Sequence, residues 1–231
     1  MRPILSPAGV VLALGAALQP LTAQDSTAYT SKPEVRFGLT SDGVTRAMSL
    51  AGAPPFKQTT RLNGVEFMAR SPKSGGIQAR YTKGEFDGPL SDASAGPLEY
   101  IDGRLLVGPR KFAVHVGYLG RTQNYNEKKR RFDLARGGAQ MTYQFEGAGV
   151  GLNLAGSYLR TITKAKNDSL EADGFEGETS LLYAVPRFPV FVQLGYRREI
   201  FNISKENTNL RREEVSGVLM SIGVHYGLST R

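Results

Sequence analysis

Apolar side chains recur at every second position along most of this chain. In residues 111–120, KFAVHVGYLG, one side of the predicted strand is apolar and the other is small or polar. The apolar side consists of Phe112, Val114, Val116 and Tyr118, and the opposite side of Ala113, His115 and Gly117. A period of two is typical of a β-strand with one apolar face. Helical periodicity is almost absent after residue 23, so the sequence predicts an all-β protein.

Ten segments carry this alternation. They are residues 34–40, 62–70, 76–86, 98–107, 111–121, 132–145, 149–162, 175–185, 189–201 and 214–228. The dipeptide Asp102–Gly103 favours a tight turn, but Ile101, Leu105 and Val107 keep one parity through it, which favours a strand. The first segment is short, so an eight-stranded arrangement with a different N-terminal part stays open.

The connections between these segments fall into two alternating kinds. Short turns such as SPKSG and GPR alternate with longer polar stretches such as KAKNDSLEADG and NISKENTNLRREE. This alternation is expected of a closed, antiparallel, up-and-down barrel in an outer membrane, with short periplasmic turns and long outer loops. The alternative is a soluble sandwich or lipocalin-like barrel, which has no comparable reason to separate its loops by length.

Closure of the barrel predicts which side of each strand meets lipid. A closed barrel leaves no unpaired strand edge in the bilayer, and its outward side chains must be apolar. Val218, Met220, Ile222, Val224, Tyr226 and Leu228 are predicted to face lipid on the last strand. On the sixth strand the apolar parity changes between Leu134 and Ala139, and a β-bulge at Gly137–Gly138 is predicted to cause the change.

Charged side chains of the opposite parity are predicted to line the lumen. They are Glu66, Arg70, Arg80, Asp102, Arg104, His115, Glu178, Arg197 and Glu199. The simplest expectation is a network of ion pairs that fills the interior, since eight to ten strands leave little more room than side chains occupy. The alternative is a narrow channel with a charged lumen.

The first 23 residues have the features of a cleaved secretory signal. A basic start at Arg2 precedes an apolar run over residues 10–18, and cleavage is expected after Ala23. Residues 24–33 are then a periplasmic N-terminal segment, and residues 34–231 form the barrel with both termini periplasmic. The chain has no cysteine and a net charge of +8, and we expect no nucleic-acid partner in an outer membrane.

These features resemble the small bacterial outer-membrane β-barrel superfamily, which includes OmpA-type transmembrane domains and porin-like barrels. The resemblance covers residues 34–228 and depends on the signal segment, the alternating connections and the closing strand VLMSIGVHYGL. Members commonly end on an aromatic residue, whereas here Leu228 and three further residues follow Tyr226. The resemblance implies an outer-membrane location and names no subfamily.

Candidate chemistry is sparse. His115 and His225 are the only histidines, and without cysteine they form no recognisable metal-ligand set. Ser221 shares a face with His225, but four residues of strand separate them by about 13 Å. We therefore predict no catalytic residue, cofactor or metal. An omptin-type protease would need a histidine at the outer rim, where neither is expected.

The densest charge run is NEKKRR, which is predicted to lie in an outer loop. Its cations are Lys128, Lys129, Arg130 and Arg131, which are suited to lipopolysaccharide phosphates. The alternative is an ordinary solvated loop.

The sequence thus predicts a monomeric, non-enzymatic membrane component or a narrow porin-like channel for small solutes. Two alternatives stay open: a barrel enzyme that acts on lipid or lipopolysaccharide, and a surface adhesion protein that uses its long outer loops.

Overall fold

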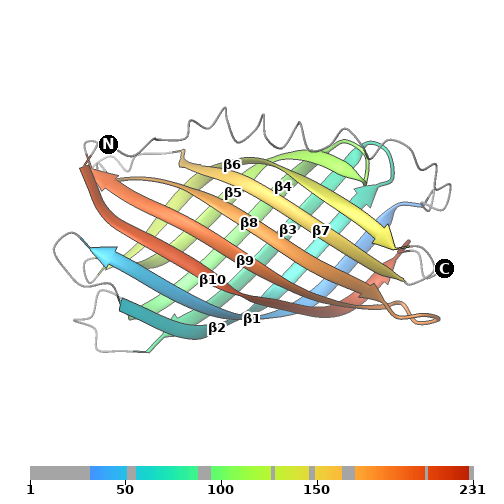
Figure 1. The fold of residues 1–231 in the computed structure, drawn as a ribbon, viewed down its shortest axis with the longest axis horizontal. Helices are drawn as coiled ribbons and strands as arrows, with labels where there is room; N and C mark the ends of the chain where they lie inside the picture. The colour runs from blue at the N-terminus through green and yellow to red at the C-terminus, as the bar shows by residue number, and fades with distance from the viewer. Residues whose placement is uncertain are drawn as a thin grey trace.

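Ten antiparallel strands close into a barrel in the order β1–β10–β9–β8–β7–β6–β5–β4–β3–β2 (Figure 1). The computed structural model describes residues 32–50, 56–87, 95–125, 128–145, 149–162, 170–205 and 208–228. The strands are β1 (Glu34–Leu50), β2 (Phe56–Ser71), β3 (Gly75–Phe86), β4 (Gly96–Val107), β5 (Phe112–Tyr125), β6 (Lys128–Phe145), β7 (Val150–Thr161), β8 (Leu170–Ala184), β9 (Val190–Lys205) and β10 (Thr208–Tyr226). The predicted all-β, ten-stranded closed barrel is confirmed. The predicted signal segment, residues 1–23, and most of residues 24–33 lie outside the described residues.

Asp102 and Gly103 lie inside β4, paired with Arg80 and Ala79 of β3, so the segment is a strand and not a turn. Among the described residues, no helix is long and apolar enough to cross a membrane.

Several strands extend well beyond their predicted ends. β1 continues through residues 41–50, and β9 and β10 are separated only by residues 206–207. β5 and β6 are likewise separated only by residues 126–127. The expected strict alternation of long and short connections is therefore wrong at these two hairpins. The polar residues that suggested loops belong to strands, some on the outward face and others, such as Arg46 and Glu213, buried in the interior.

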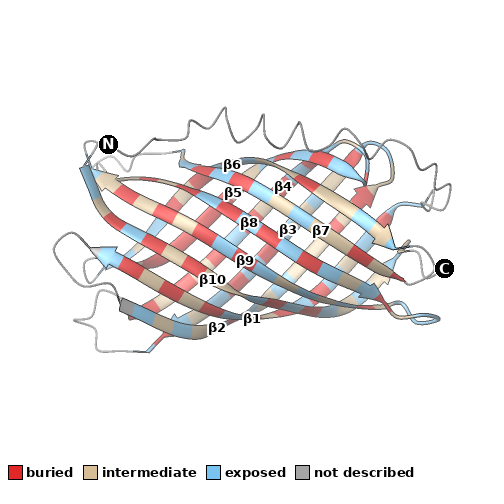
Figure 2. Ribbon diagram, viewed as in Figure 1, coloured by how far each residue is buried: buried red, intermediate tan, exposed pale blue. Residues whose placement is uncertain are grey.

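The half of the barrel nearest the short turns, here called the belt half, is apolar outside and polar inside. Its turns include residues 72–74, 108–111 and 185–189. The outward side chains Phe37, Leu39, Leu105, Val116, Leu194, Met220 and Ile222 are 50 to 61% exposed. The burial colours alternate along each strand (Figure 2), as expected when successive side chains point to opposite faces. This outward apolar surface is the lipid belt.

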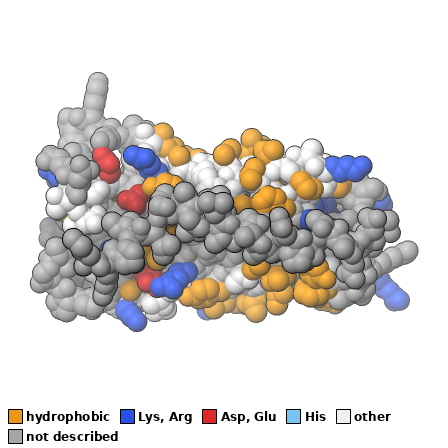
Figure 3. Space-filling view, turned by 45° about the horizontal axis from the view of Figure 1, so that its top comes forward, with side chains coloured by type: hydrophobic (Ala, Val, Ile, Leu, Met, Phe, Trp, Pro, Cys, Tyr) orange, Lys and Arg blue, Asp and Glu red, His pale blue; other side chains and the backbone are white. Residues whose placement is uncertain are grey.

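The other half, here called the head half, has the opposite polarity. Its interior contains an apolar cluster of Val44, Leu62, Phe86, Leu98, Tyr100, Leu119, Phe132, Leu134, Leu159, Ala172, Phe201, Ile203 and Val215. The Phe132 and Phe201 rings pack edge to face with centroids 5.6 Å apart. Outside, polar and charged side chains replace the belt (Figure 3). The head half is thus built like a water-soluble barrel.

This inversion explains why the predicted bulge at Gly137–Gly138 is wrong. β6 pairs with both neighbours in continuous register from Leu134 to Met141. Phe132 and Leu134 point inward into the apolar cluster, whereas Tyr143 points outward and is 51% exposed. The parity never slips, because the apolar face changes sides where the strand leaves the belt. Tyr100 follows the same rule, since it is buried in the apolar cluster inside the head half.

A charge scan tests the inversion. We expect Val116→Arg, in the belt, to lower the free energy of unfolding by about 2–4 kcal/mol, because arginine then faces hydrocarbon. The control Ser204→Arg, on the outward face of the head half, should stay within about 0.5 kcal/mol of the parent. Urea unfolding in lipid vesicles, followed by gel mobility, measures both. Equal losses at the two positions would contradict the inversion.

Candidate functional site: the barrel interior

All nine charged residues predicted to line the lumen point into the interior. Arg70, Arg80, Asp102, Arg104, His115, Glu178, Arg197 and Glu199 are at most 9% exposed, and Glu66 is half-buried. The interior also holds buried charges that were not predicted: Asp42, Arg46, Arg121, Arg136, Glu176, Arg211 and Glu213. Four of these lie in stretches interpreted as loops, and Arg136 lies where a parity slip was expected. Alternation continued past the predicted strand ends could have revealed those four, and parity within the predicted strands could have revealed Arg121 and Glu176.

A central ionic layer crosses the barrel between β4, β6, β8 and β9. Arg104 Nη2 lies 2.9 Å from Asp102 Oδ2 and 3.1 Å from Glu176 Oε1. Arg136 binds both carboxylates, with Nη2 2.5 Å from Glu176 Oε2. Arg197 Nη2 lies 3.2 Å from the same Glu176 oxygen. Each carboxylate is shared between at least two guanidinium groups, which offsets the cost of removing these charges from water.

A second ionic cluster lies within the head half. Arg121 Nη1 donates to Glu199 Oε1 at 2.6 Å, and its Nη2 binds Glu213. Glu213 also accepts from Gln123 at 2.9 Å and lies 2.5 Å from Arg211 Nε. Arg121, Glu199 and Glu213 have fully buried side chains. The Arg121 guanidinium lies 4.4 Å from the centroid of the Phe201 ring, so this cluster is continuous with the apolar one.

Arg46 is the exception in this cluster. It is 1% exposed, and none of its three guanidinium nitrogens has a hydrogen-bond partner within the described part of the chain. Its guanidinium lies 4.1 Å from the centroid of the Phe86 ring. A cation–π contact of this kind compensates only part of the desolvation cost of a buried charge.

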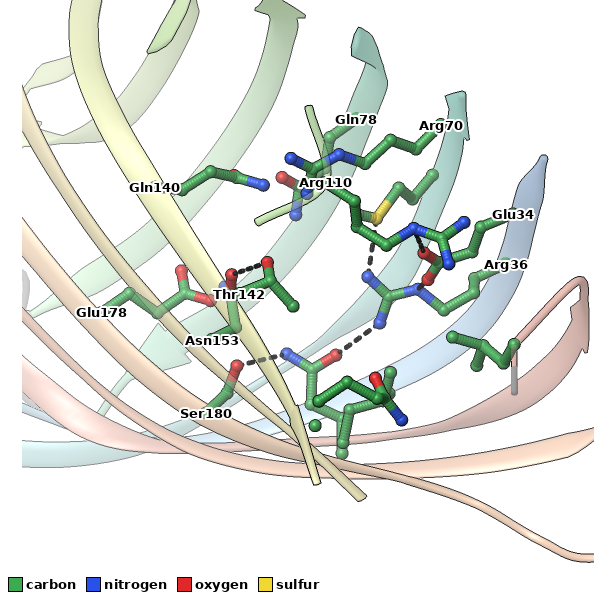
Figure 4. Close-up of a pocket in the computed structure, with 16 residues that line it drawn as sticks. Glu34, Arg36, Arg70, Gln78, Arg110, Gln140, Thr142, Asn153, Glu178 and Ser180 are labelled. Carbon is green, nitrogen blue, oxygen red and sulfur yellow. Dashed lines mark hydrogen bonds and ion pairs between the residues drawn. The ribbon is translucent and has the colours of Figure 1, made fainter. Parts of the chain in front are cut away.

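A polar cavity occupies the interior of the belt half near the short turns (Figure 4). Arg36 Nε lies 2.9 Å from Glu34, and Arg36 Nη1 donates to Gln193 at 3.1 Å. Gln193 in turn donates to Ser180 at 3.0 Å. Water molecules can occupy about 30 Å³ of this cavity, which is room for about two of them.

Leu228 lines this cavity, so its predicted place on the lipid face is wrong. The chain turns at Gly227, whose φ of 79° favours glycine, and the strand parity therefore ends at Tyr226.

His115 lies opposite Ser157 inside the barrel. His115 Nε2 and Ser157 Oγ share a hydrogen bond of 2.9 Å, but Nδ1 has no partner among the described residues. The pair is buried, with exposed fractions of 1% and 6%. A nucleophile and base need an orienting third group and access for a substrate, and this geometry supplies neither. The described residues contain no cluster of potential metal ligands.

The basic run at residues 128–131 is not a loop, which corrects that prediction. Lys128, Lys129, Arg130 and Arg131 all belong to β6. Arg131 Nε lies 2.9 Å from Asp133, and Arg131 Nη2 donates to Tyr118 Oη at 2.6 Å. The run suggested a loop because charged side chains cover the outside of the head half, where an apolar face was expected.

The interior and the belt together define the class of barrel. An even number of antiparallel strands closes without an edge, and an apolar band surrounds a polar interior in the belt half. The architecture is that of an outer-membrane β-barrel.

Comparisons with solved structures return outer-membrane barrels at low similarity. Ail, the attachment invasion locus protein of Yersinia pestis in complex with the heparin analogue sucrose octasulfate, is 10% identical, with a TM-score of 0.33 over 84% of this chain and 99% of that chain. A loop-deletion mutant of OmpT, an outer membrane protein of Vibrio cholerae, is 9% identical, with a TM-score of 0.25 over 83% and 99%. OpdQ of Pseudomonas aeruginosa is 10% identical, with a TM-score of 0.23 over 84% and 99%. No protein-family model and no curated protein sequence matches the chain. TM-scores this low carry no inference about function.

Two arginine substitutions compare the stability contribution of a buried charge that has carboxylate partners with that of a buried charge that has no hydrogen-bond partner. Arg121→Met removes a partner from Glu199 and Glu213, and we expect it to lower the free energy of unfolding by about 3–5 kcal/mol. Arg46→Met removes a charge that has no hydrogen-bond partner, so stability should be unchanged or higher. Urea titrations of the refolded proteins in the same lipid compare them. A loss at Arg46 as large as that at Arg121 would show that Arg46 has a stabilising partner.

Proposed function

We propose that this protein is a non-enzymatic outer-membrane barrel with a closed lumen that acts at the cell surface through its head half. The observation that carries the proposal is the filled interior. The polar cavity of the belt half is followed by the layer of Arg104, Arg136 and Glu176, and then by the apolar cluster of the head half.

Conduction would require an ion to pass both layers. The ionic layer is held by guanidinium groups that each contact more than one carboxylate, so a path through it needs several contacts to break together. In the head half the apolar cluster is packed against the buried ion pairs of Arg121 with Glu199 and Glu213. An ion would have to break these pairs or lose its water among apolar side chains, and both are costly. In a second cavity, beside Asp42 and Arg197, water can occupy only about 10 Å³. These features favour a structural interior over the narrow-channel alternative.

The surface role is supported by the length of the head half. On β1 the outward apolar residues end at Leu39, and the strand continues from Ser41 to Leu50. At about 3.3 Å per residue this is roughly 30 Å of additional strand. The apolar interior of this part means that it needs no lipid to be stable, so it can stand in water as a rigid platform.

The enzymatic alternative receives less support. The only close histidine–hydroxyl pair among the described residues, His115 and Ser157, is buried in the interior and has no opening to lipid. A site for lipid or lipopolysaccharide would need its reacting groups on the outward surface.

Single-channel recording in a planar bilayer tests the closed lumen. We expect refolded protein, with folding verified by heat-dependent gel mobility, to give no discrete conductance steps. The filled interior is the physical reason. Conductance steps that change when Arg197 is neutralised in Arg197→Gln would contradict the proposal and support a channel with a charged lumen.

A further inference from the structure

The wall formed by β10, β1, β2 and β3 carries exposed cations on the outside of the head half. They are Lys57, Arg61 and Lys83 on one side of β1 and Arg212 on the other. None of the four makes an ion pair among the described residues, whereas Arg131 on the opposite wall is held by Asp133 at 2.9 Å. This wall therefore has cationic groups available to a partner.

The register places two of these cations directly next to the edge of the belt. Val65 pairs with Tyr81, and both are 38% exposed as the last apolar outward residues on β2 and β3. Asn63 pairs with Lys83, one outward position further along. Arg61 is the next outward residue of β2 and is a diagonal neighbour of Lys83, at about 7–8 Å between Cα atoms. The cations thus lie at the level where lipid headgroups meet the barrel.

The outward face of β1 between the two groups of cations consists mainly of short polar side chains. Ser41 donates to Asn63 at 2.9 Å, and the hydroxyls of Thr45 and Thr59 lie 3.1 Å apart. These short side chains leave the longer Lys and Arg side chains on either side as the most protruding groups.

The charge of the wall is not one-sided. Glu99 of β4 lies directly across from Lys83, and Glu85 and Asp87 are the next outward residues after Lys83. Glu214 is paired with Arg198 at 3.0 Å. With Arg198 and Glu99 of the flanking strands β9 and β4 included, five cations (Lys57, Arg61, Lys83, Arg198 and Arg212) face four carboxylates (Glu85, Asp87, Glu99 and Glu214). Arg61 and Lys83 form no ion pair with these carboxylates within the described part of the chain, and the other anions available beside the belt are phosphates of membrane lipids.

We propose that this wall binds the phosphorylated headgroup of a glycolipid in the outer leaflet. Arg61 and Lys83 hold the phosphate, for which guanidinium and ammonium groups are suited. The acyl chains lie against Leu39, Val65 and Tyr81 below them. The inference builds on the proposed surface role and names its partner, but it does not depend on whether the lumen conducts.

Binding of lipid A to the refolded full chain in phosphatidylcholine vesicles tests this site. The parent protein should retain lipid A, whereas the double variant Arg61→Gln/Lys83→Gln should bind it at least about fivefold more weakly, because it lacks the two phosphate ligands. The matched control Lys32→Gln/Lys73→Gln removes two exposed cations at the short-turn end and should bind like the parent. Heat-dependent gel mobility shows that all three proteins are folded.

Dephosphorylated lipid A and inorganic phosphate complete the experiment. The site requires that the parent protein bind dephosphorylated lipid A more weakly than lipid A, and that inorganic phosphate alone compete poorly. Equal binding by the parent and the Arg61/Lys83 variant would overturn the assignment, as would equal binding of the two lipids. Full competition by inorganic phosphate would overturn the assignment to a lipid. A conducting barrel that still binds lipid A through Arg61 and Lys83 would contradict only the closed lumen.

Discussion

Each long strand of this barrel faces lipid at one end and water at the other, and its hydrogen-bond register is unbroken where the polarity changes. Side chains on a strand alternate strictly between two faces, so a one-residue slip would move every side chain to the wrong side. β6 shows the solution. Its pairing with β5 and β7 is continuous, while its apolar residues change from the inside at Leu134 to the outside at Met141. The inversion of polarity along an unbroken register determines what fills the interior at each level.

The two interiors follow from this inversion. In the belt half the outward face uses the apolar residues, so the inside is filled by shared ion pairs such as Arg136 with Asp102 and Glu176. In the head half the outside is hydrated, and the inside can be apolar around Phe132 and Phe201. Arg121 belongs to both kinds of interior, because it binds Glu199 and Glu213 while it packs against Phe201. Sharing of partners, as between Arg121 and the two glutamates, offsets the cost of burying these charges, so most of the charged interior behaves as a core.

Much of the fold could be predicted from period-two alternation, because the apolar outward face is regular in the belt half. The ends of the strands in the head half could not be predicted in this way, since there the apolar face is inward and is interrupted by buried charges such as Arg46 and Arg211. A stretch such as residues 208–217 therefore has the composition of a loop. Charges within predicted strands, such as Arg104 and Arg197, could be assigned to the interior by parity alone. Which carboxylate each of them contacts depends on neighbours across the barrel, such as Glu176 for both, and no local pattern contains that information.

The level at which polarity inverts can be measured most directly with spin labels along β10. The chain has no cysteine, so single cysteines can be introduced at Ser216, Leu219 and Ile222 without a background signal. In lipid vesicles, the label at position 222 should be accessible to oxygen and that at 216 to a water-soluble nickel chelate. The label at 219 should be shielded from both, because Leu219 is 2% exposed inside the barrel. Oxygen accessibility at 216 equal to that at 222 would mean that lipid covers the head half, and would contradict the inversion.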